Sequence, residues 1–477
     1  MFTINRFFKS GKLLLPILLV SLFSCSKAHN DNTLPAAITS FSFNQSANTI
    51  PVTSTASISG TNIYIFLPPK TNTNALVANF TLSDSSTVSV NGVAQQSGVT
   101  ANNFTNPVTY TVTNQAGYTQ SYTVTLTTDI ASIDQNVTAF MTQYAVPGLS
   151  LAITLDDKLV YAKAYGVSDA ANSIPASTTD LYRTVALSQQ ISSVAIMKLM
   201  DLGQINMTDK VFGTGAILGN TYGTLPYGPG ITDITVSDLL HHTAGGWAND
   251  STDPMFTNLS MSAAQLITWT LDNRPLTYTP GSHFVYSNFG YCILGRVIEK
   301  ITGQSYADAV KSLALQPCGI TDMQIAGNTL ADRIPHEVIY YGQNNADPYD
   351  FNITRMDSHS GWLATATDMA RFLAHVDGLS SLTIISPNAI NVMTTPSTAN
   401  PQYACGWFLD IPNQAWYHPG GLPGSGAQET ISTKYGNFNF VVLTNTQNIT
   451  STFGHDMGQI VYNAISIPQP WPNYDLF

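Results

Sequence analysis

Residues 146–200, "VPGLSLAITLDDKLVYAKAYGVSDAANSIPASTTDLYRTVALSQQISSVAIMKLM", contain the pattern that decides the fold of most of the chain. Two strand-like segments, 148–156 and 158–169, meet at Asp156-Asp157, which predicts two strands joined by a tight turn. From residue 184 onward, apolar residues recur at helical spacing, so a buried helix is expected to follow the strand pair.

The flanking segments extend this pattern into one α/β domain. Before the strand pair, apolar residues at helical spacing over 130–144 predict a helix with Thr128 or Asp129 as N-cap and Pro147-Gly148 as terminator. After it come helices and loops, and then three predicted strands: "YACGWFLD" (403–410), "AQETISTK" (427–434) and "NFNFVVLTN" (437–445). A closing helix near 456–465 ends the domain. This order predicts an antiparallel sheet that is assembled from both ends of the domain and flanked by helices. An all-helical subdomain is expected between the two groups of strands.

The sequence changes character over residues 38–128. Thr, Ser, Asn and Val dominate there, and alternation with a period of two appears in "ITSFSFN", "VTYTVTN" and "QSYTVTLTT". This pattern predicts a small antiparallel β-sandwich. The segment resembles the immunoglobulin-like modules at the N-terminus of surface lipoproteins from Bacteroidetes-type bacteria, which implies a spacer, with a glycan-binding role left open.

The first residues have the features of an export signal. Arg6, Lys9 and Lys12 precede the apolar run "LLLPILLVSLF", which is too short to span a bilayer comfortably. The run ends in "LFSC" (22–25), which resembles a bacterial lipobox, although a plain signal peptide is the alternative. We therefore predict a signal peptide over 1–24, lipidation of Cys25, a tether over 25–37, and an exported protein anchored in the cell envelope by lipid.

Charge and cysteine content limit the classes of partner and site that we expect. The chain of 477 residues carries a net charge of −11, and without the three N-terminal cations it has 15 cations against 29 anions. This charge argues against nucleic acid or an anionic membrane surface as partner, so we expect membrane contact only through the lipid. Three widely spaced cysteines, Cys292, Cys318 and Cys405, form neither a disulfide framework nor a metal motif. The sequence indicates no cofactor and no metal.

Several ordered blocks together resemble one known family. They begin with 146–200 and continue with "ITVSDLLHHTAGG" (234–246), "PGSHFVYSNFGYCILGRVIEKITGQSYAD" (280–308), "SGWLATATDMARFL" (360–373) and "YHPGGLPGSG" (417–426). These blocks resemble the β-lactamase-related serine hydrolases, which include class C β-lactamases, DD-peptidases and similar esterases. The resemblance implies a β-lactamase-like domain over 129–466, followed by a C-terminal tail over 467–477.

The resemblance also implies a site built from three motifs. The family uses a serine nucleophile with a lysine three residues on, then Tyr-x-Asn, then His or Lys before a small residue and Gly. Tyr286 and Asn288 complete the second motif, and His418 and Gly420 belong to the third, where Pro419 departs from the usual small residue. These four retained side chains and backbone positions are the predicted site residues.

The first motif is altered. The resemblance places Ala186 at the nucleophile and Gln189 at the base. Ser188 is the candidate substitute nucleophile, but on a helix it points about 200° away from position 186. The leading hypothesis is thus a pseudoenzyme that binds a small peptide, cell-wall fragment or acyl ligand. A working serine hydrolase with a displaced nucleophile and a structural or adhesive surface protein are the alternatives.

Other polar residues are interpreted as architecture. Thr235 with Asp238, and Thr365 with Asp368, have the spacing of helix N-terminal capping boxes, and Gly245 is expected to close the first of these helices. The neighbouring histidines at 241 and 242 point about 100° apart on a helix, so a structural role is favoured over a shared metal.

Overall fold

A computed structural model describes residues 35–477 of the chain. The predicted signal peptide, the lipidation site Cys25 and most of the predicted tether lie outside the described residues. Within residues 35–477, no helix is long and apolar enough to cross a membrane.

Residues 38–127 form the predicted all-β sandwich. One sheet has the order β2-β1-β5-β8, with bounds Ser54–Thr55, Ile38–Phe43, Leu76–Leu82 and Ala101–Asn102. The other has the order β3-β4-β10-β9-β6-β7, with bounds Ser57–Ser59, Asn62–Phe66, Thr119–Thr127, Val108–Thr113, Thr87–Val90 and Val93–Ala94. Phe41, Phe43 and Tyr110 pack edge to face in the core between them. The expectation of a wholly antiparallel arrangement is wrong at one pair, because β10 runs parallel to β4.

A seven-stranded antiparallel sheet organises the rest of the chain. Its order is β13-β12-β11-β20-β19-β18-β17, with bounds Ile174–Pro175, Lys158–Asp169, Gly148–Leu155, Phe438–Thr444, Ser425–Ser432, Ala415–Leu422 and Phe408–Asp410. Strand β11 pairs with both β12 and β20, for example Leu151 with Val442. The predicted assembly of the sheet from both ends of the domain is therefore confirmed.

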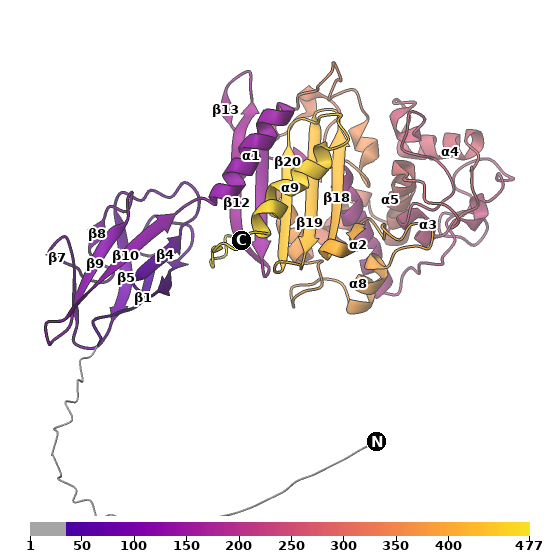
Figure 1. The fold of residues 1–477 in the computed structure, drawn as a ribbon. Helices are drawn as coiled ribbons and strands as arrows, with labels where there is room; N and C mark the ends of the chain where they lie inside the picture. Colours follow the sequence, from indigo (N-terminus) through magenta and orange to yellow (C-terminus); the bar gives the residue numbers. More distant parts are fainter. Residues whose placement is uncertain (1–34) are drawn as a thin grey trace, which may run out of the picture.

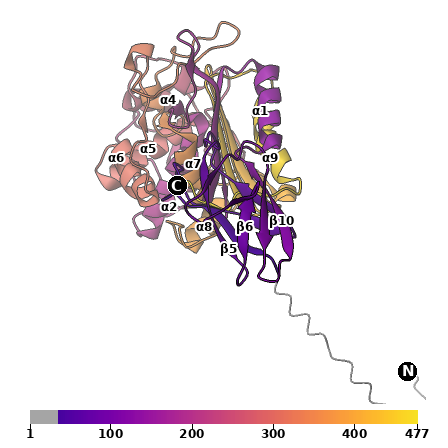
Figure 2. The same cartoon turned by 90° about the vertical axis from the view of Figure 1, so that its left-hand side faces the viewer.

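Helices cover the two faces of this sheet unequally. Helices α1 (Ala131–Tyr144) and α9 (Phe453–Ile465) lie on the outer face, where α9 runs obliquely across the strands (Figures 1 and 2). The opposite face carries the helical part: α2 (Ser188–Asp201), α3 (Val236–Leu240), α4 (Ala263–Asn273), α5 (Asn288–Thr302), α6 (Tyr306–Val310), α7 (Ala366–Ala374) and α8 (Pro387–Thr394). A small sheet, β14-β16-β15 (Tyr182–Arg183, Trp362–Ala364, Gln324–Ile325), lies beside it.

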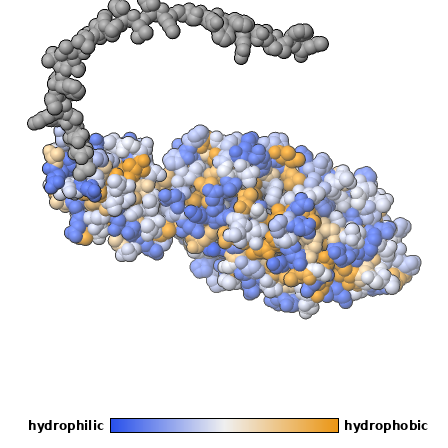
Figure 3. Space-filling view, turned by 90° about the horizontal axis from the view of Figure 1, so that it is seen from below, coloured by the Kyte–Doolittle hydropathy of each residue, from blue (hydrophilic) through white to orange (hydrophobic). Residues whose placement is uncertain are grey.

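Two hydrophobic cores result from this layering. The larger core joins the inner face of the sheet to α2, α5 and α7, and the smaller one lies between its outer face and α1 and α9. The space-filling view shows a largely hydrophilic surface with scattered hydrophobic side chains (Figure 3). The predicted multidomain fold class, an all-β module followed by an α/β domain with a helical subdomain, is confirmed.

The predicted start of α1 is wrong. Ile130 is the N-cap, and it makes no side-chain capping bond. Asp129 cannot cap the helix because its carboxylate pairs with Lys163 Nζ at 2.6 Å, and Thr128 donates its hydroxyl to Asp129. The chain reverses at Ala145, in the left-handed region at φ 51°, before the predicted Pro147-Gly148 terminator.

The two capping boxes form as predicted. Thr235 and Asp238 cap α3, and Thr365 and Asp368 cap α7. Gly245 does not close α3, however, because the helix ends at Leu240; the glycine lies in a later turn at φ 98°. The strand predicted over 403–410 shrinks to Phe408–Asp410.

Candidate functional site

The start of helix α2 defines one wall of the candidate site. A short 3-10 turn, Val185–Leu187, leads into α2 and places Ala186 at a cleft. Val185 has φ 43°, a left-handed conformation that is strained for a β-branched residue. The backbone at the predicted nucleophile position is thus held in a sharp, strained turn although residue 186 carries only a methyl group.

Strand β18 forms the opposite wall. It passes so close to the turn that a Cβ on Gly420 would lie 2.4 Å from Val185 Cγ2 and 3.0 Å from the backbone nitrogen of Ala186. Only glycine fits such an approach without movement of the turn. Pro419, which departs from the family pattern, lies in the strand and faces Gln428 of β19 across the ladder.

The cleft between these walls has a volume of about 200 Å³. It contains Ala186 and the three predicted side chains Tyr286, Asn288 and His418, so the structure brings these together. The remaining lining residues are Asn249, Phe256, Ser360, Phe408, Pro419, Gly421 and Leu422.

Gln189 lies one turn after Ala186, at the position where the resemblance implies a lysine, and carries a neutral amide. Its Nε2 donates to Tyr286 Oη at 2.7 Å and to Asn288 Oδ1 at 3.4 Å. Its Oε1 accepts from Tyr403 Oη at 3.4 Å. Both ends of the side-chain amide are therefore occupied, and a carboxamide has no basic lone pair to take a proton.

A second layer of polar groups holds this network from behind. Tyr403 Oη lies 3.0 Å from His242 Nε2, and His242 Nδ1 accepts from the backbone nitrogen of Ser287 at 3.1 Å. Asn288 Nδ2 donates to the buried carboxylate of Asp253 at 2.9 Å. These contacts fix the second motif from two directions.

The side chains that line the cleft are uncharged near pH 7, and the Asp253 carboxylate behind Asn288 is not among them. No lysine or arginine is among the residues that line it. Burial lowers the pKa of His418 to about 4 and raises the pKa of the Tyr286 phenol, so both groups are uncharged at that pH. Burial also raises the pKa of Asp253 to about 6, although its hydrogen bonds act in the opposite direction.

Ser188 does not reach the cleft. It is fully buried, its hydroxyl lies 3.0 Å from Thr184 Oγ1, and it accepts from the backbone nitrogen of Trp362 at 3.4 Å. The structure therefore places this serine on the inner side of the helix, apart from Tyr286. Across residues 35–477, no group of three or more His, Cys, Asp and Glu side chains is arranged to hold a metal ion.

Sequence reasoning missed three supporting residues. His242 was interpreted only as part of a helix, yet its ring centre lies 4.2 Å from that of Tyr286. Tyr403 belonged to a predicted strand, and Asp253 carried no motif. The backbone of His242 has a positive φ of 55°, so the chain leaves the helix before this residue. No pattern in the sequence predicts this turn.

Comparisons with known proteins identify the families of the two domains. A family model described as Beta-lactamase matches residues 133–459, and one described as SGBP, N-terminal, matches residues 38–126. Protein flp of Staphylococcus aureus strain MRSA252 is 27% identical over 309 residues, 63% of this chain and 60% of that protein. A putative D-alanyl-D-alanine carboxypeptidase of Escherichia coli O157:H7 is 26% identical over 55% of this chain and 68% of its own length.

Solved structures show the same fold. The octameric penicillin-binding protein homologue from Pyrococcus abyssi has a TM-score of 0.59 at 20% identity and covers 70% of this chain and 78% of its own. The D-amino acid amidase from Ochrobactrum anthropi SV3 has a TM-score of 0.58 at 19% identity, covering 70% and 99%. The chain spans about 60% of the length of the staphylococcal relatives it matches.

Proposed function

Because the chain belongs to the beta-lactamase family, we propose that its cleft binds a small peptide, cell-wall fragment or other acyl compound without cleaving it. The observation that carries this proposal is the pair of contacts from Gln189 Nε2 to Tyr286 and Asn288, beside Ala186. A neutral amide occupies the place of the base, and a methyl group occupies the place of the nucleophile.

Catalysis by the family's route needs both missing groups. Covalent catalysis requires a side chain that can form the acyl bond, and Ala186 has none. Loss of the serine alone lowers turnover by about six orders of magnitude in a well-studied serine hydrolase. Tyr286 does not replace the base, because burial raises its pKa and keeps the phenol protonated.

The neutral cleft favours an uncharged ligand group. A free carboxylate would lose its hydration without meeting a lysine or arginine, at a cost in binding free energy. Since one relative is described as a putative D-alanyl-D-alanine carboxypeptidase, a D-alanyl-D-alanine peptide is a suitable first probe. Its C-terminal amide should bind at least as tightly as its free acid, as measured by isothermal titration calorimetry.

We also propose that the protein acts as a lipoprotein of the cell envelope. The support is the order of Arg6, Lys9 and Lys12, the apolar run and Cys25 in the sequence. Metabolic labelling with an alkyne fatty acid should mark the native chain in its host and not the Cys25→Ala variant. Equal labelling of both chains would contradict attachment at that cysteine.

The absence of catalysis is tested by intact-mass spectrometry after incubation with a fluorophosphonate and, separately, with a reactive β-lactam. The native chain should gain no adduct mass. The Ala186→Ser/Gln189→Lys double variant should gain it, because the strained turn, Tyr286 and Asn288 are already in place.

The Ser188→Ala variant is the matched control for a displaced nucleophile. An adduct on the native chain that disappears in Ser188→Ala would identify Ser188 as a nucleophile and refute the proposed binding-only role. An adduct that persists in Ser188→Ala would also refute it, and peptide mapping would then identify the nucleophile.

A further inference from the structure

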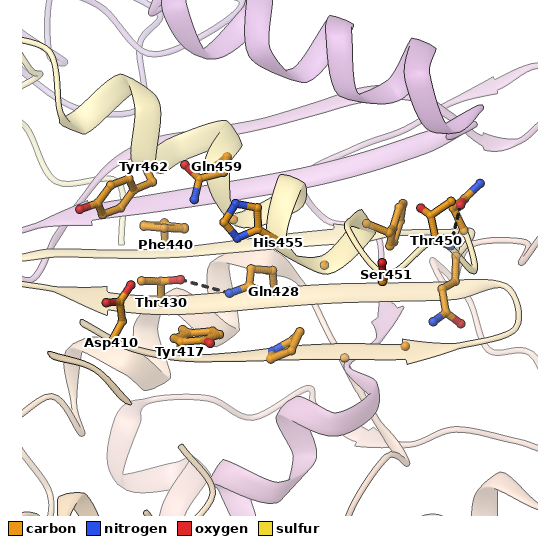
Figure 4. A pocket seen from close by; sticks show the side chains of 18 of the residues that line it. Asp410, Tyr417, Gln428, Thr430, Phe440, Thr450, Ser451, His455, Gln459 and Tyr462 are labelled. Atoms are coloured by element: carbon orange, nitrogen blue, oxygen red, sulfur yellow. Dashed lines mark hydrogen bonds between the residues drawn. The ribbon is translucent and has the colours of Figure 1, made fainter. Parts of the chain in front are cut away.

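A second hollow lies on the outer face of the seven-stranded sheet, across β18 from the cleft, and Pro419 and Gly421 line both. This outer groove, of about 540 Å³, is bounded by β17 to β20, by α9 and by the loop 447–451 (Figure 4). Successive residues of β18 point to opposite faces, so Tyr417 lines the outer groove whereas His418 lines the cleft. Its volume falls within the usual range for small-molecule sites.

Two glycines of α9 keep the outer groove open. A Cβ on Gly454 would lie 3.2 Å from Pro419 Cβ, and a Cβ on Gly458 would lie 3.5 Å from the side chain of Gln428. These glycines are one helical turn apart and face the sheet. Larger residues at both positions would project into the space between helix and strands.

The floor and wall combine aromatic rings with fixed polar groups. Tyr417 of β18 and Tyr462 of α9 are the partly exposed rings, whereas Phe440 of β20 is 1% exposed and belongs to the core (Figure 4). Gln428 is only 4% exposed, and its Nε2 donates to Thr430 Oγ1 at 3.3 Å and to the Glu429 carbonyl at 3.2 Å. No hydrogen bond to its Oε1 is found in the described part of the chain, so this carbonyl oxygen can accept from a ligand in the groove.

The charge of the outer groove excludes an anionic ligand. Asp410 contributes a carboxylate, and no lysine or arginine is among the lining residues. The Asp410 carboxylate is not bare, because it accepts from Asn413 Nδ2 at 2.7 Å and from the Asn413 backbone nitrogen at 3.3 Å. An ionised carboxylate has about four acceptor sites, so beside these two bonds it can also accept from a ligand hydroxyl.

We propose that the outer groove binds a neutral saccharide. The negative π face of an aromatic ring attracts the polarised C–H groups on the flat side of a pyranose. Amides and hydroxyls match sugar hydroxyls, because each provides both donor and acceptor capacity. This proposal does not rest on the binding proposed for the cleft.

The test is isothermal titration calorimetry with the purified chain and four neutral hexasaccharides: β-1,4-, α-1,4- and β-1,3-linked glucose, and β-1,4-linked N-acetylglucosamine. At least one should bind, and Tyr417→Ala should weaken that binding at least tenfold. Gly458→Ala should weaken it at least threefold; this variant keeps its fold, because alanine favours a helix and the added methyl makes an ordinary contact.

Tyr118→Ala is the matched control, since Tyr118 is a 60% exposed tyrosine on the N-terminal sandwich. Binding that is retained in this control and weakened to these extents in both groove variants would support the proposal. Lack of binding to all four sugars would overturn it, as would binding unaffected by Tyr417→Ala and Gly458→Ala. Binding of choline at the groove without any saccharide would overturn it in favour of an ammonium ligand.

Discussion

Replacing Glu429 by glutamine should stabilise the protein in a strongly pH-dependent way. Glu429 lies in β19, between His418 of β18 and Val441 of β20, and it is fully buried. Neither carboxyl oxygen has a hydrogen-bond partner in the described residues, and burial raises its pKa well above the ordinary value of 4.5. The folded chain therefore carries this side chain as a neutral acid.

The magnitude follows from proton linkage. A group whose pKa is raised in the folded state contributes stability below its unfolded pKa, and that contribution is lost as the pH rises. Above pH 4.5, the ordinary pKa, folding requires Glu429 to take up a proton, which costs about 1.36 kcal/mol for each pH unit. At pH 7 this cost reaches up to about 3.4 kcal/mol. Glutamine has nearly the same shape and needs no proton.

The assay is urea unfolding of the native and Glu429→Gln chains between pH 4.5 and 8. All six tryptophans lie between positions 247 and 471, so their fluorescence reports the larger domain. The gain in unfolding free energy should approach about 3 kcal/mol at pH 7 and vanish near pH 4.5. Glu299→Gln, which removes a carboxylate paired with Arg296 at 2.7 Å, should give no gain. A gain for Glu429→Gln that is the same at every pH would refute the reasoning.

Three further changes have defined outcomes. Gly420→Ala should destabilise the domain by about 1–3 kcal/mol in urea unfolding, because its methyl would meet Val185 at 2.4 Å. Thr365→Ala should cost about 1 kcal/mol by removing the cap bond to the Asp368 backbone nitrogen, measured in the same way. His418 is buried with its pKa lowered to about 4, so native stability is complete above its unfolded pKa near 6.5 and falls as the pH drops below that. His418→Gln should make that acid loss shallower by up to about 1.36 kcal/mol per pH unit, measured by unfolding at pH 4 to 7.

Local patterns predict strands β11, β12, β19 and β20 of the central sheet, but neither β13 nor β18. Strands β11 and β12 match the predicted segments because an uninterrupted apolar and β-branched run signals a buried strand. The start of α1 could not be read locally, since Lys163, far along the sequence, takes up the carboxylate of Asp129. The strand predicted from residue 403 begins only at 408, because Gly406 at φ 85° breaks the extended backbone.

The sequence predicts only those site residues that belong to a family motif. Position 186, Gln189 and the Tyr286 motif could be placed from sequence, and the structure brings them together at one cleft. The support from Tyr403 and His242 could not be predicted. Tyr403 lies 214 positions from Gln189, and its contact depends on how the helical insertion folds back onto α2. Such long-range hydrogen bonds have no periodicity that a sequence pattern can reveal.

The free-energy cost of burying His418 favours ligand binding over a purely structural role for the cleft. Gln189 is explained by the fold alone, because its amide satisfies Tyr286, Asn288 and Tyr403. His418 is different: it is 1% exposed, its Nδ1 meets only the neighbouring Pro419 carbonyl, and its Nε2 has no partner in the described residues. An unpaired buried nitrogen costs about 1–3 kcal/mol, which an apolar residue of similar size would not incur. A scaffold gains nothing from this cost, whereas a ligand with an N–H or O–H group can recover it by donating to Nε2, since Nδ1 holds the proton that faces the Pro419 carbonyl.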